Sequence, residues 1–574
     1  MKRICVLAFV LLAVAICPAK DNGSKNKPQD NQDNIVRRDI LIEKQFLNLP
    51  VKNGANNNLM KLLVDGSIVQ AFTIEYGEKD ESFWVFIDVS DYKGKTVTIE
   101  MKAKKGAGDK ILDRICHSDN IKGGENLYKE ELRPQFHFTS RRGWNNDPDG
   151  LVYYKGEWHL FYQHNPFGIG HDNMHWGHAV STDLLHWKEL KDAICPDELG
   201  TIFSGSAVVD FDNSAGFQKG DDKTIVAFYT SAGGKNKWSK GKPFTQSIAY
   251  SNDRGRTWTK YQDNPVIGHI RGYNRDPKVI RHNDTGKWVM VVYLDKTDGE
   301  KTLGFFTSDN LKEWERESTI TGFHECPELF ELAIDGDENN TRWVLYGANG
   351  KYHIGDFDGK SFTPETEIIR YSYGDAFYAS QTWNNVPAQD GRRIQIAWAQ
   401  VKFPEMPFSQ MMTFPVELTL HTTDDGIRMY AWPVREIETI RTKKYSLKDE
   451  QLSEGENPLK DIKGELFDIV AEFEVGDAKK VILNVRGVEI VYDVKKHLLV
   501  CNGKRAPLKP ADGKVRLRVL ADRGMRDIFG NGGQVYMPIG KFAQNGDKSL
   551  KIFSTGGNAS VTKLDVYELE SVWR

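Results

Sequence analysis

The chain has 574 residues, which is too long for one hydrophobic core and predicts about three domains. Lysine and arginine total 77 against 80 aspartate and glutamate residues, so the formal net charge is −3. This balance excludes the basic excess that nucleic-acid-binding proteins use to neutralise phosphates, and we expect no nucleic-acid partner.

The first residues have the pattern of an export signal. A positive Lys2-Arg3 pair precedes an apolar run over residues 4–16, which is too short to span a bilayer. Two processing modes fit the sequence: cleavage after Ala19, and lipid attachment at Cys17, where the preceding residues faintly resemble a lipobox. We predict a signal peptide over residues 1–19 and a periplasmic or extracellular protein, with a lipid anchor at Cys17 as the alternative and no membrane span.

A polar segment and a strand-rich segment follow. Residues 20–35 are rich in Asn, Asp and Lys and predict a linker. Apolar runs at 39–42, 83–87 and 96–100, separated by Gly-containing turns, predict strands. We therefore expect a β-rich, sandwich-like accessory domain over residues 36–130.

The central region repeats. A short apolar strand ending in an aromatic residue recurs every 50 to 70 residues, at 156–162, 223–229, 286–293, 341–346 and 393–398. Repeats of this length made of short strands are typical of β-propellers, whose blades hold about four strands each. The sequence therefore predicts a five-bladed β-propeller over residues 131–440.

The pattern changes again after the propeller. Alternating apolar residues at 467–473, 481–485, 488–494 and 515–520 predict half-buried strands of a C-terminal β-sandwich over residues 445–574. The cysteines are scattered, with no C-x-x-C spacing and no dense framework. We therefore predict an all-β fold without disulfide staples, without a metal site and without a cofactor.

Acidic residues precede three of the repeated strands at similar positions. Asp147 lies before the first repeat, Asp276 before the third and Glu325 before the fourth. Propeller blades run outward from the central channel, so the strand before each repeat should be innermost. Because this topology gathers the three acids at one mouth of the channel, we expect them to share one site.

Three neighbouring carboxylates repel one another, and Arg275 is the natural compensating charge. Glycosidases require one ionised carboxylate and one protonated acid beside the scissile bond. We assign Asp147 as the nucleophile, Glu325 as the acid/base and Asp276 as the group that stabilises the transition state.

The motifs around these acids resemble glycoside hydrolase family 32, the family of invertases, inulinases, levanases and fructan β-fructosidases. The resemblance covers residues 132–574 and rests on segments 137–139, 144–150, 161–166, 176–178, 203–206, 275–277 and 325–327. It implies a retaining mechanism, a five-bladed propeller and a fructan substrate. By motif matching it places these residues in the fructose pocket: Asn146, Gln163, Trp176, Phe203, Ser204 and Arg275.

The chain departs from the family pattern in places. Asn145 and Asp149 replace the usual Met and second Asn of the first motif; we expect Asn145 to alter the pocket wall and Asp149 to cap a turn. The N-terminal sandwich lies outside the common family plan, and an accessory module and a structural brace both fit it. Three neighbouring histidines are expected to shape sugar subsites and not to bind metal: His171, His175 and His178.

The predicted activity is exo-hydrolysis of β-fructofuranosidic linkages in fructans, levan or inulin, with release of fructose, and sucrose is a further candidate substrate. The alternatives are a fructosyltransferase, an endo-levanase, a catalytically dead sugar-binding propeller and an inverting propeller glycosidase acting on arabinan. The motifs do not distinguish β-2,6 from β-2,1 linkages. We expect that preference to depend on loops near Trp238, Phe408 and Trp383.

Overall fold

The computed structural model describes residues 34–103, 109–297 and 299–573. The predicted export signal lies outside these residues, as does most of the predicted linker. The first strand, β1, begins at Asn34, inside the range expected to be linker. Over the part of the chain that is described, no helix has the length and apolar character required to cross a membrane.

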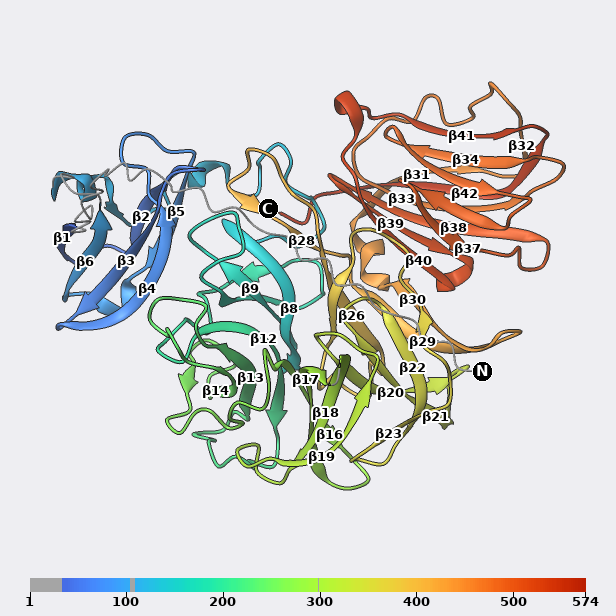
Figure 1. Ribbon diagram of the computed structural model, residues 1–574. Helices are drawn as coiled ribbons and strands as arrows, with labels where there is room; N and C mark the ends of the chain where they lie inside the picture. The colour runs from blue at the N-terminus through green and yellow to red at the C-terminus, as the bar shows by residue number, and fades with distance from the viewer. Residues whose placement is uncertain (1–33, 104–108, 298, 574) are drawn as a thin grey trace, which may run out of the picture.

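Two antiparallel sheets form the N-terminal part (Figure 1). One has the order β1 (Asn34–Leu41), β6 (Thr96–Ala103), β3 (Asn57–Val64), β4 (Ser67–Glu75), and the other β5 (Phe83–Asp88), β2 (Phe46–Val51), β7 (Cys116–Ser118). Side chains along β5 and most of β6 alternate between buried and partly exposed. That alternation is expected for a sheet with one face on a core. The short 3₁₀ helices here are η1 (Ser90–Tyr92), η2 (Asp109–Arg114) and η3 (Gly124–Asn126).

Five blades follow within residues 143–297 and 299–433, as the repeat predicts. Blade one is β8 (Gly143–Tyr154), β9 (Glu157–Asn165), β10 (His175–Ser181), β11 (Lys188–Glu189); blade two is β12 (Thr201–Asp210), β13 (Thr224–Ala232), β14 (Phe244–Ser251), β15 (Thr259–Lys260); blade three is β16 (Arg275–His282), β17 (Lys287–Thr297), β18 (Glu300–Ser308), β19 (Glu315–Thr321). Each repeated segment is the second strand of its blade, so the strand before it is innermost.

Blades four and five share backbone pairing. Blade four is β20 (Glu328–Ile334), β21 (Asp337–Gly347), β22 (Lys351–Phe357), β23 (Phe362–Pro364), with β24 (Ile369–Arg370) on β22; blade five is β25 (Tyr378–Thr382), β26 (Arg393–Ala399), β28 (Met411–Met412), β29 (Val416–Thr423), β30 (Gly426–Pro433). One parallel pair, Ile334 with Leu420, joins them into one sheet. β27 (Phe408–Ser409) returns to pair with β8 of blade one, which links the last blade to the first.

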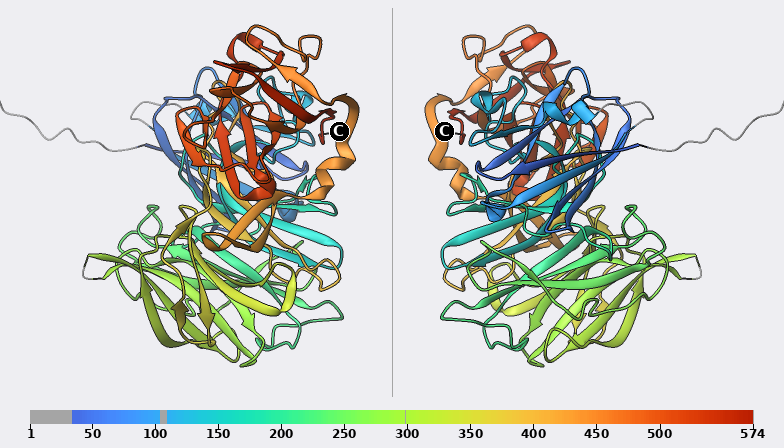
Figure 2. Two further views of the ribbon diagram at one scale, coloured as in Figure 1. Left: turned by 90° about the vertical axis from the view of Figure 1, so that its right-hand side faces the viewer. Right: turned by 90° about the vertical axis from the view of Figure 1, so that its left-hand side faces the viewer.

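The C-terminal part is a second sandwich, as the alternating strands predict. One sheet has β31 (Arg441–Leu447), β42 (Ala559–Leu569), β33 (Phe467–Glu474), β38 (Lys514–Asp522), β39 (Met525–Gly530), β40 (Val535–Gly540), with β32 (Glu450–Leu452) on β42; the other has β37 (Lys504–Pro507), β36 (Leu498–Cys501), β35 (Val488–Asp493), β34 (Lys480–Val485), β41 (Leu550–Thr555). The 3₁₀ helices η4 (Arg435–Ile440), η5 (Asn531–Gly533) and η6 (Gln544–Gly546) lie in connections. Both sandwiches lie along the same side of the propeller, as Figure 2 shows.

A buried histidine joins the propeller to the C-terminal sandwich. The His137 ring contacts Asp522 Oδ2 through Nδ1 at 2.9 Å and Asp527 Oδ2 through Nε2 at 2.7 Å, and all three side chains are fully buried. Burial by itself would lower the pKa of His137, but the two carboxylates outweigh it and raise that pKa to about 9. The ring is therefore protonated at neutral pH and holds two anions at the interface.

Candidate active site

The inner strands are irregular where they carry the predicted site residues. Antiparallel pairing shifts register at the same end of four of them: between Asn145 and Pro148 in β8, Phe203 and Gly205 in β12, Arg275 and Lys278 in β16, and Tyr378 and Gln381 in β25. A bulge of this kind re-aims side chains and ends regular pairing. These four blades thereby present polar groups to one mouth of the channel instead of continuing their ladders.

Asp147 is held by neighbours from blades one and two. Ser204 Oγ donates to Asp147 Oδ2 at 2.7 Å, and Asn146 Nδ2 donates to Oδ1 at 3.1 Å. Trp144 Nε1 in turn donates to Asn146 Oδ1 at 2.9 Å, which fixes that amide. Burial raises the pKa of Asp147, and the bonds from Ser204 and Asn146 oppose the rise.

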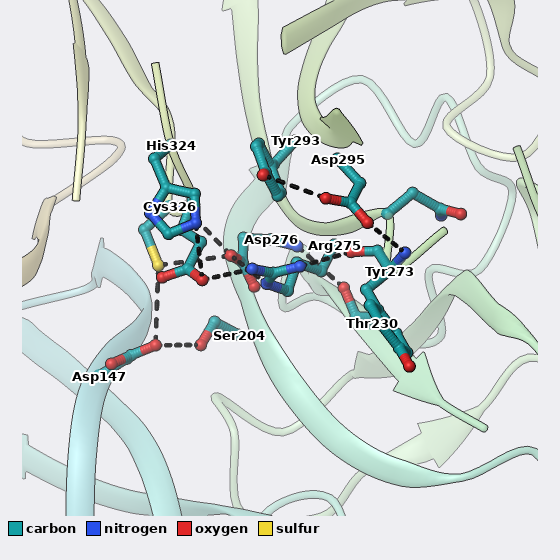
Figure 3. A network of polar contacts seen from close by, with 12 residues as sticks. Asp147, Ser204, Thr230, Tyr273, Arg275, Asp276, Tyr293, Asp295, His324 and Cys326 are labelled. Atoms are coloured by element: carbon teal, nitrogen blue, oxygen red, sulfur yellow. Dashed lines mark hydrogen bonds and ion pairs between the residues drawn. The ribbon is translucent and has the colours of Figure 1, made fainter. Parts of the chain in front are cut away.

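Cys326 connects two of the three acids (Figure 3). Its thiol donates to Asp147 Oδ2 at 3.6 Å and to Asp276 Oδ2 at 3.5 Å, and its backbone N–H donates to Asp276 Oδ2 at 3.1 Å. Burial raises the pKa of Asp276 to about 7; the Arg275 charge opposes the rise, and the carboxylates of Glu325 and Asp147 add to it. Asp276 therefore gains a proton near neutral pH.

The pKa of Glu325 is shifted in the opposite direction. Arg275 forms an ion pair with its Oε1, the Tyr378 hydroxyl donates to Oε2 at 2.6 Å, and His324 Nε2 lies 3.2 Å from Oε1. Burial favours the neutral acid, but these partners, Arg275 first, outweigh it and lower the pKa of Glu325. In the substrate-free protein Asp276 therefore keeps its proton to a higher pH than Glu325 does.

The backbone adopts left-handed conformations at two of the three acids and at Cys326. The φ angles are 61° at Asp276, 51° at Glu325 and 39° at Cys326, and none of these residues is glycine. Non-glycine residues adopt this region at a cost, and such residues cluster at functional sites. Glu325 and Cys326 lie in the connection before β20, so this connection and not the strand itself presents them.

The other predicted pocket residues form two layers. Phe203 is half-buried and Ser204 contacts Asp147, whereas Gln163 and Trp176 are buried behind them. Trp176 Nε1 donates to the Phe203 carbonyl at 3.1 Å and so supports the residue beside it. Direct contact of Gln163 and Trp176 with sugar stays a prediction.

Asp149 does not cap a turn. It is fully buried, and it accepts hydrogen bonds from Gln163 Nε2 at 2.8 Å and from the Gly205 N–H at 3.2 Å. The bond from Gln163 joins neighbouring strands of blade one, and the bond from Gly205 joins blade two to blade one. Local sequence could not indicate either contact. Burial and the adjacent Asp147 raise the pKa of Asp149 well above its usual range.

The prediction that three histidines lie at sugar subsites is wrong for two of them. The β10 strand turns His175 and His178 into the protein, where both are buried; His178 Nε2 lies 3.0 Å from His159 Nδ1 and its ring stacks on Phe161. Only His171 is exposed, with its ring 5.9 Å from that of Phe203. Among the described residues, no group of three or more His, Cys, Asp and Glu side chains is arranged to hold a metal ion.

Two of the three aromatic residues near which we expect the loops that set linkage preference are buried, and the role of those loops stays a prediction. Trp383 is fully buried and donates to the His159 carbonyl at 2.9 Å, and Phe408 is fully buried beneath the Arg133 guanidinium. Both rings serve packing and do not reach an open subsite. Trp238 is half-buried.

Several residues at the mouth were missed from sequence. Tyr378 and His324 contact Glu325, and an aromatic row continues from Phe203 to Phe244 and Tyr273, with ring centroids 5.6 and 5.1 Å apart. Tyr273 is 57% exposed, so part of its ring is open to solvent at this mouth. Tyr378 could have been found, since it stands before the fifth repeat as Asp147 stands before the first.

Comparison with known proteins supplies the context for this geometry. Residues 137–433 match the model of the glycosyl hydrolases family 32 N-terminal domain, and residues 436–568 match that of the family 32 C terminal domain. The chain belongs to glycosyl hydrolase family 32. Residues 34–136 lie outside both matches.

Two curated relatives and two solved structures are similar to the chain. A levanase of Bacillus subtilis (strain 168) is 38% identical over 496 residues, which cover 78% of this chain and 72% of the levanase. An extracellular exo-inulinase of Aspergillus ficuum is 31% identical, covering 80% of this chain and 98% of its own. The crystal structure of exo-inulinase from Aspergillus awamori superposes with a TM-score of 0.71 at 30% identity, covering 78% of this chain and 100% of that one. Fructofuranosidase from Schwanniomyces occidentalis, complexed with fructose, gives 0.69 at 28% identity over 76% and 98%.

Proposed function

We propose that this glycoside hydrolase cleaves β-fructofuranosidic linkages of fructans from the chain end and releases fructose. The observation that carries the proposal is the meeting of Asp147, Asp276 and Glu325, from three blades, around Cys326 and Arg275. The family membership supports β-fructofuranosidase activity on fructans or sucrose.

In the proposed retaining mechanism, Asp147 attacks the anomeric carbon of the fructosyl unit. The carbon–oxygen bond to the leaving group breaks, and Glu325 gives that oxygen its proton. Glu325 then removes a proton from water, which attacks the same carbon and releases fructose and free Asp147. Asp276 stabilises the positive charge that develops on the ring.

The proton must reach Glu325 before the first step. Arg275 and Tyr378 hold Glu325 ionised in the free protein, while Asp276 takes up a proton near pH 7. We infer that sugar hydroxyls compete for the donors of Arg275, which weakens its hold on Glu325 and raises the pKa of that acid. Substrate binding would then let Glu325 take up the proton that it gives to the leaving group.

Product analysis tests the reaction and its competitors. The purified protein is incubated with levan, inulin and sucrose, and the products are separated by chromatography. Fructose as the first product supports exo-hydrolysis, whereas longer oligosaccharides indicate a fructosyltransferase and short fructan fragments an endo-levanase. Retained binding without products would identify a dead sugar-binding propeller.

Two variants test the roles. Asp147→Asn removes the nucleophile and should lower kcat at least about a thousandfold while leaving the melting temperature unchanged. Glu325→Gln should lose activity on sucrose but release about one fluoride per molecule from fructosyl fluoride, whose leaving group needs no proton. Asp212→Asn, at an exposed position, is the control. Wild-type activity in Asp147→Asn would refute the assignment.

We also propose that the protein is exported. The Aspergillus ficuum relative is described as extracellular, and the N-terminal pattern agrees with export. Fractionation of cells, followed by mass determination of the mature N-terminus, tests export and distinguishes release from lipid attachment at Cys17.

A further inference from the structure

The N-terminal sandwich docks on the β9–β10 loop of blade one, residues 166–174. β4 is an edge strand, and its Thr73 N–H donates to Asn173 Oδ1 at 2.8 Å while Asn173 Nδ2 donates to the Thr73 carbonyl at 2.8 Å. The Asn173 amide thus replaces a neighbouring strand and covers groups that an edge would leave open. Beside it, the Phe72 and Phe167 rings stack with centroids 3.6 Å apart.

The anchored loop also reaches the active-site mouth. His171 lies two residues before Asn173, is exposed, and has its ring 5.9 Å from that of Phe203. Phe203 precedes Ser204, whose hydroxyl binds Asp147. The loop therefore connects the N-terminal sandwich on one side with the reacting centre on the other.

A groove of about 470 Å³ lies along this connection. Its walls come from both parts of the chain: Asn53, Asn57 and Glu75 from the N-terminal sandwich, and Gly168 to Asn173 from the loop. Asn53 and Asn57 are exposed, and Glu75 is half-buried. In Figure 1 the sheet that contains β3 and β4 stands directly beside the β9 blade.

We propose that this groove is a distal subsite that binds fructosyl units of a fructan chain beyond the unit being cleaved, an inference that rests on the function proposed above. Amide and carboxylate side chains both accept hydrogen bonds and the amides also donate, which matches the vicinal hydroxyls of a sugar. His171 lines the groove and lies beside Phe203, so a fructan chain that leaves the site past His171 would enter the groove. A short substrate fills only the site itself.

The competing explanation is a brace without contact to substrate. A brace acts on the shape of the active site and so affects short and long substrates equally. A subsite affects only substrates long enough to reach it. The ratio of kcat/KM for polymer to kcat/KM for the shortest substrate cleaved separates the two.

The test uses full-length Asn53→Ala and Glu75→Ala variants, with Asn56→Ala as the matched control. Asn56 is an exposed asparagine of the same turn but does not line the groove. Kinetics are measured with levan and inulin of defined length and with the shortest oligosaccharide cleaved.

Loss of one hydrogen bond to sugar should lower kcat/KM for the polymer about two- to tenfold in Asn53→Ala and in Glu75→Ala. The value for the shortest substrate and all values of Asn56→Ala should stay at wild type. An unchanged ratio, from no effect or from equal losses, overturns the subsite. A wild-type protein inactive on every fructofuranoside instead overturns the proposed function, so the two failures are distinguishable.

Discussion

A buried ion pair lies directly beneath the three acids. Lys278 Nζ is 2.8 Å from Glu328 Oε1, and each side chain is 1% exposed. Thr382 donates to Glu328 Oε2 through its N–H at 3.0 Å and its hydroxyl at 2.6 Å, while Lys278 donates to the Thr382 carbonyl at 3.0 Å. The three residues link β16, β20 and β25. Lys278 is two positions after Asp276, and Glu328 is two positions after Cys326.

Lys278→Met should destabilise the protein strongly. It keeps the volume of the side chain but leaves the Glu328 carboxylate buried without its cation, and loss of one partner of such a pair costs about 3–5 kcal/mol. At roughly 2–4 °C per kcal/mol for a domain of this size class, the melting temperature should fall on the order of 10 °C. The double variant Lys278→Met/Glu328→Gln removes both charges and should recover most of the loss.

The loss of stability caused by Lys278→Met should depend on pH. Burial already raises the pKa of Glu328 in the folded protein, and removal of Lys278 raises it further. A carboxyl with a raised folded-state pKa favours folding at low pH, and that contribution is lost as pH rises through the folded-state pKa. The gap between Lys278→Met and wild type should therefore be larger at pH 8 than at pH 5.

Thermal unfolding followed by circular dichroism at both pH values, at one fixed scan rate, checks these expectations. A Lys278→Met protein that melts within about 2 °C of wild type at pH 8 would show that the pair does not hold the inner strands. A double variant as unstable as the single one would show that lost packing, and not the unpaired charge, is responsible.

Two further predictions concern protons. Asp522 and Asp527 raise the pKa of His137 to about 9 in the folded protein. The contribution of the protonated ring to the free energy of unfolding is therefore fully present below 6.5, the pKa of an unperturbed histidine, and is lost as pH rises through about 9. This amounts to about 3 kcal/mol, so the guanidinium midpoint should fall over that window in wild type and change less in His137→Gln. The acid cluster must keep one proton for catalysis, so kcat/KM should fall as pH rises through about 7, the pKa of Asp276; a fall only above pH 9 would contradict this.

The sequence by itself determined the blades and the position of the acids. Two signals are local in the sequence: the alternation of apolar residues, and the turn residues that recur at the blade spacing. The strands β9, β13, β17, β21 and β26 form where this repeat predicts them. The same repeat places Asp147 and Asp276 on innermost strands, because connectivity within a blade is fixed once the blade is identified. The family motifs surround these same positions.

Only the tertiary structure decided the protonation state of those acids. Cys326 bonds Asp147, 179 residues away, and Arg275 bonds Glu325, 50 residues away. Burial raises the pKa of Asp147 and of Asp276, whereas Arg275 and its neighbours outweigh burial and lower the pKa of Glu325. Burial of His178 and the covering of the β4 edge by Asn173 likewise depend on contacts between distant segments. Desolvation and ion pairing act through space, so chain order predicts which groups meet but not how each is charged or what covers it.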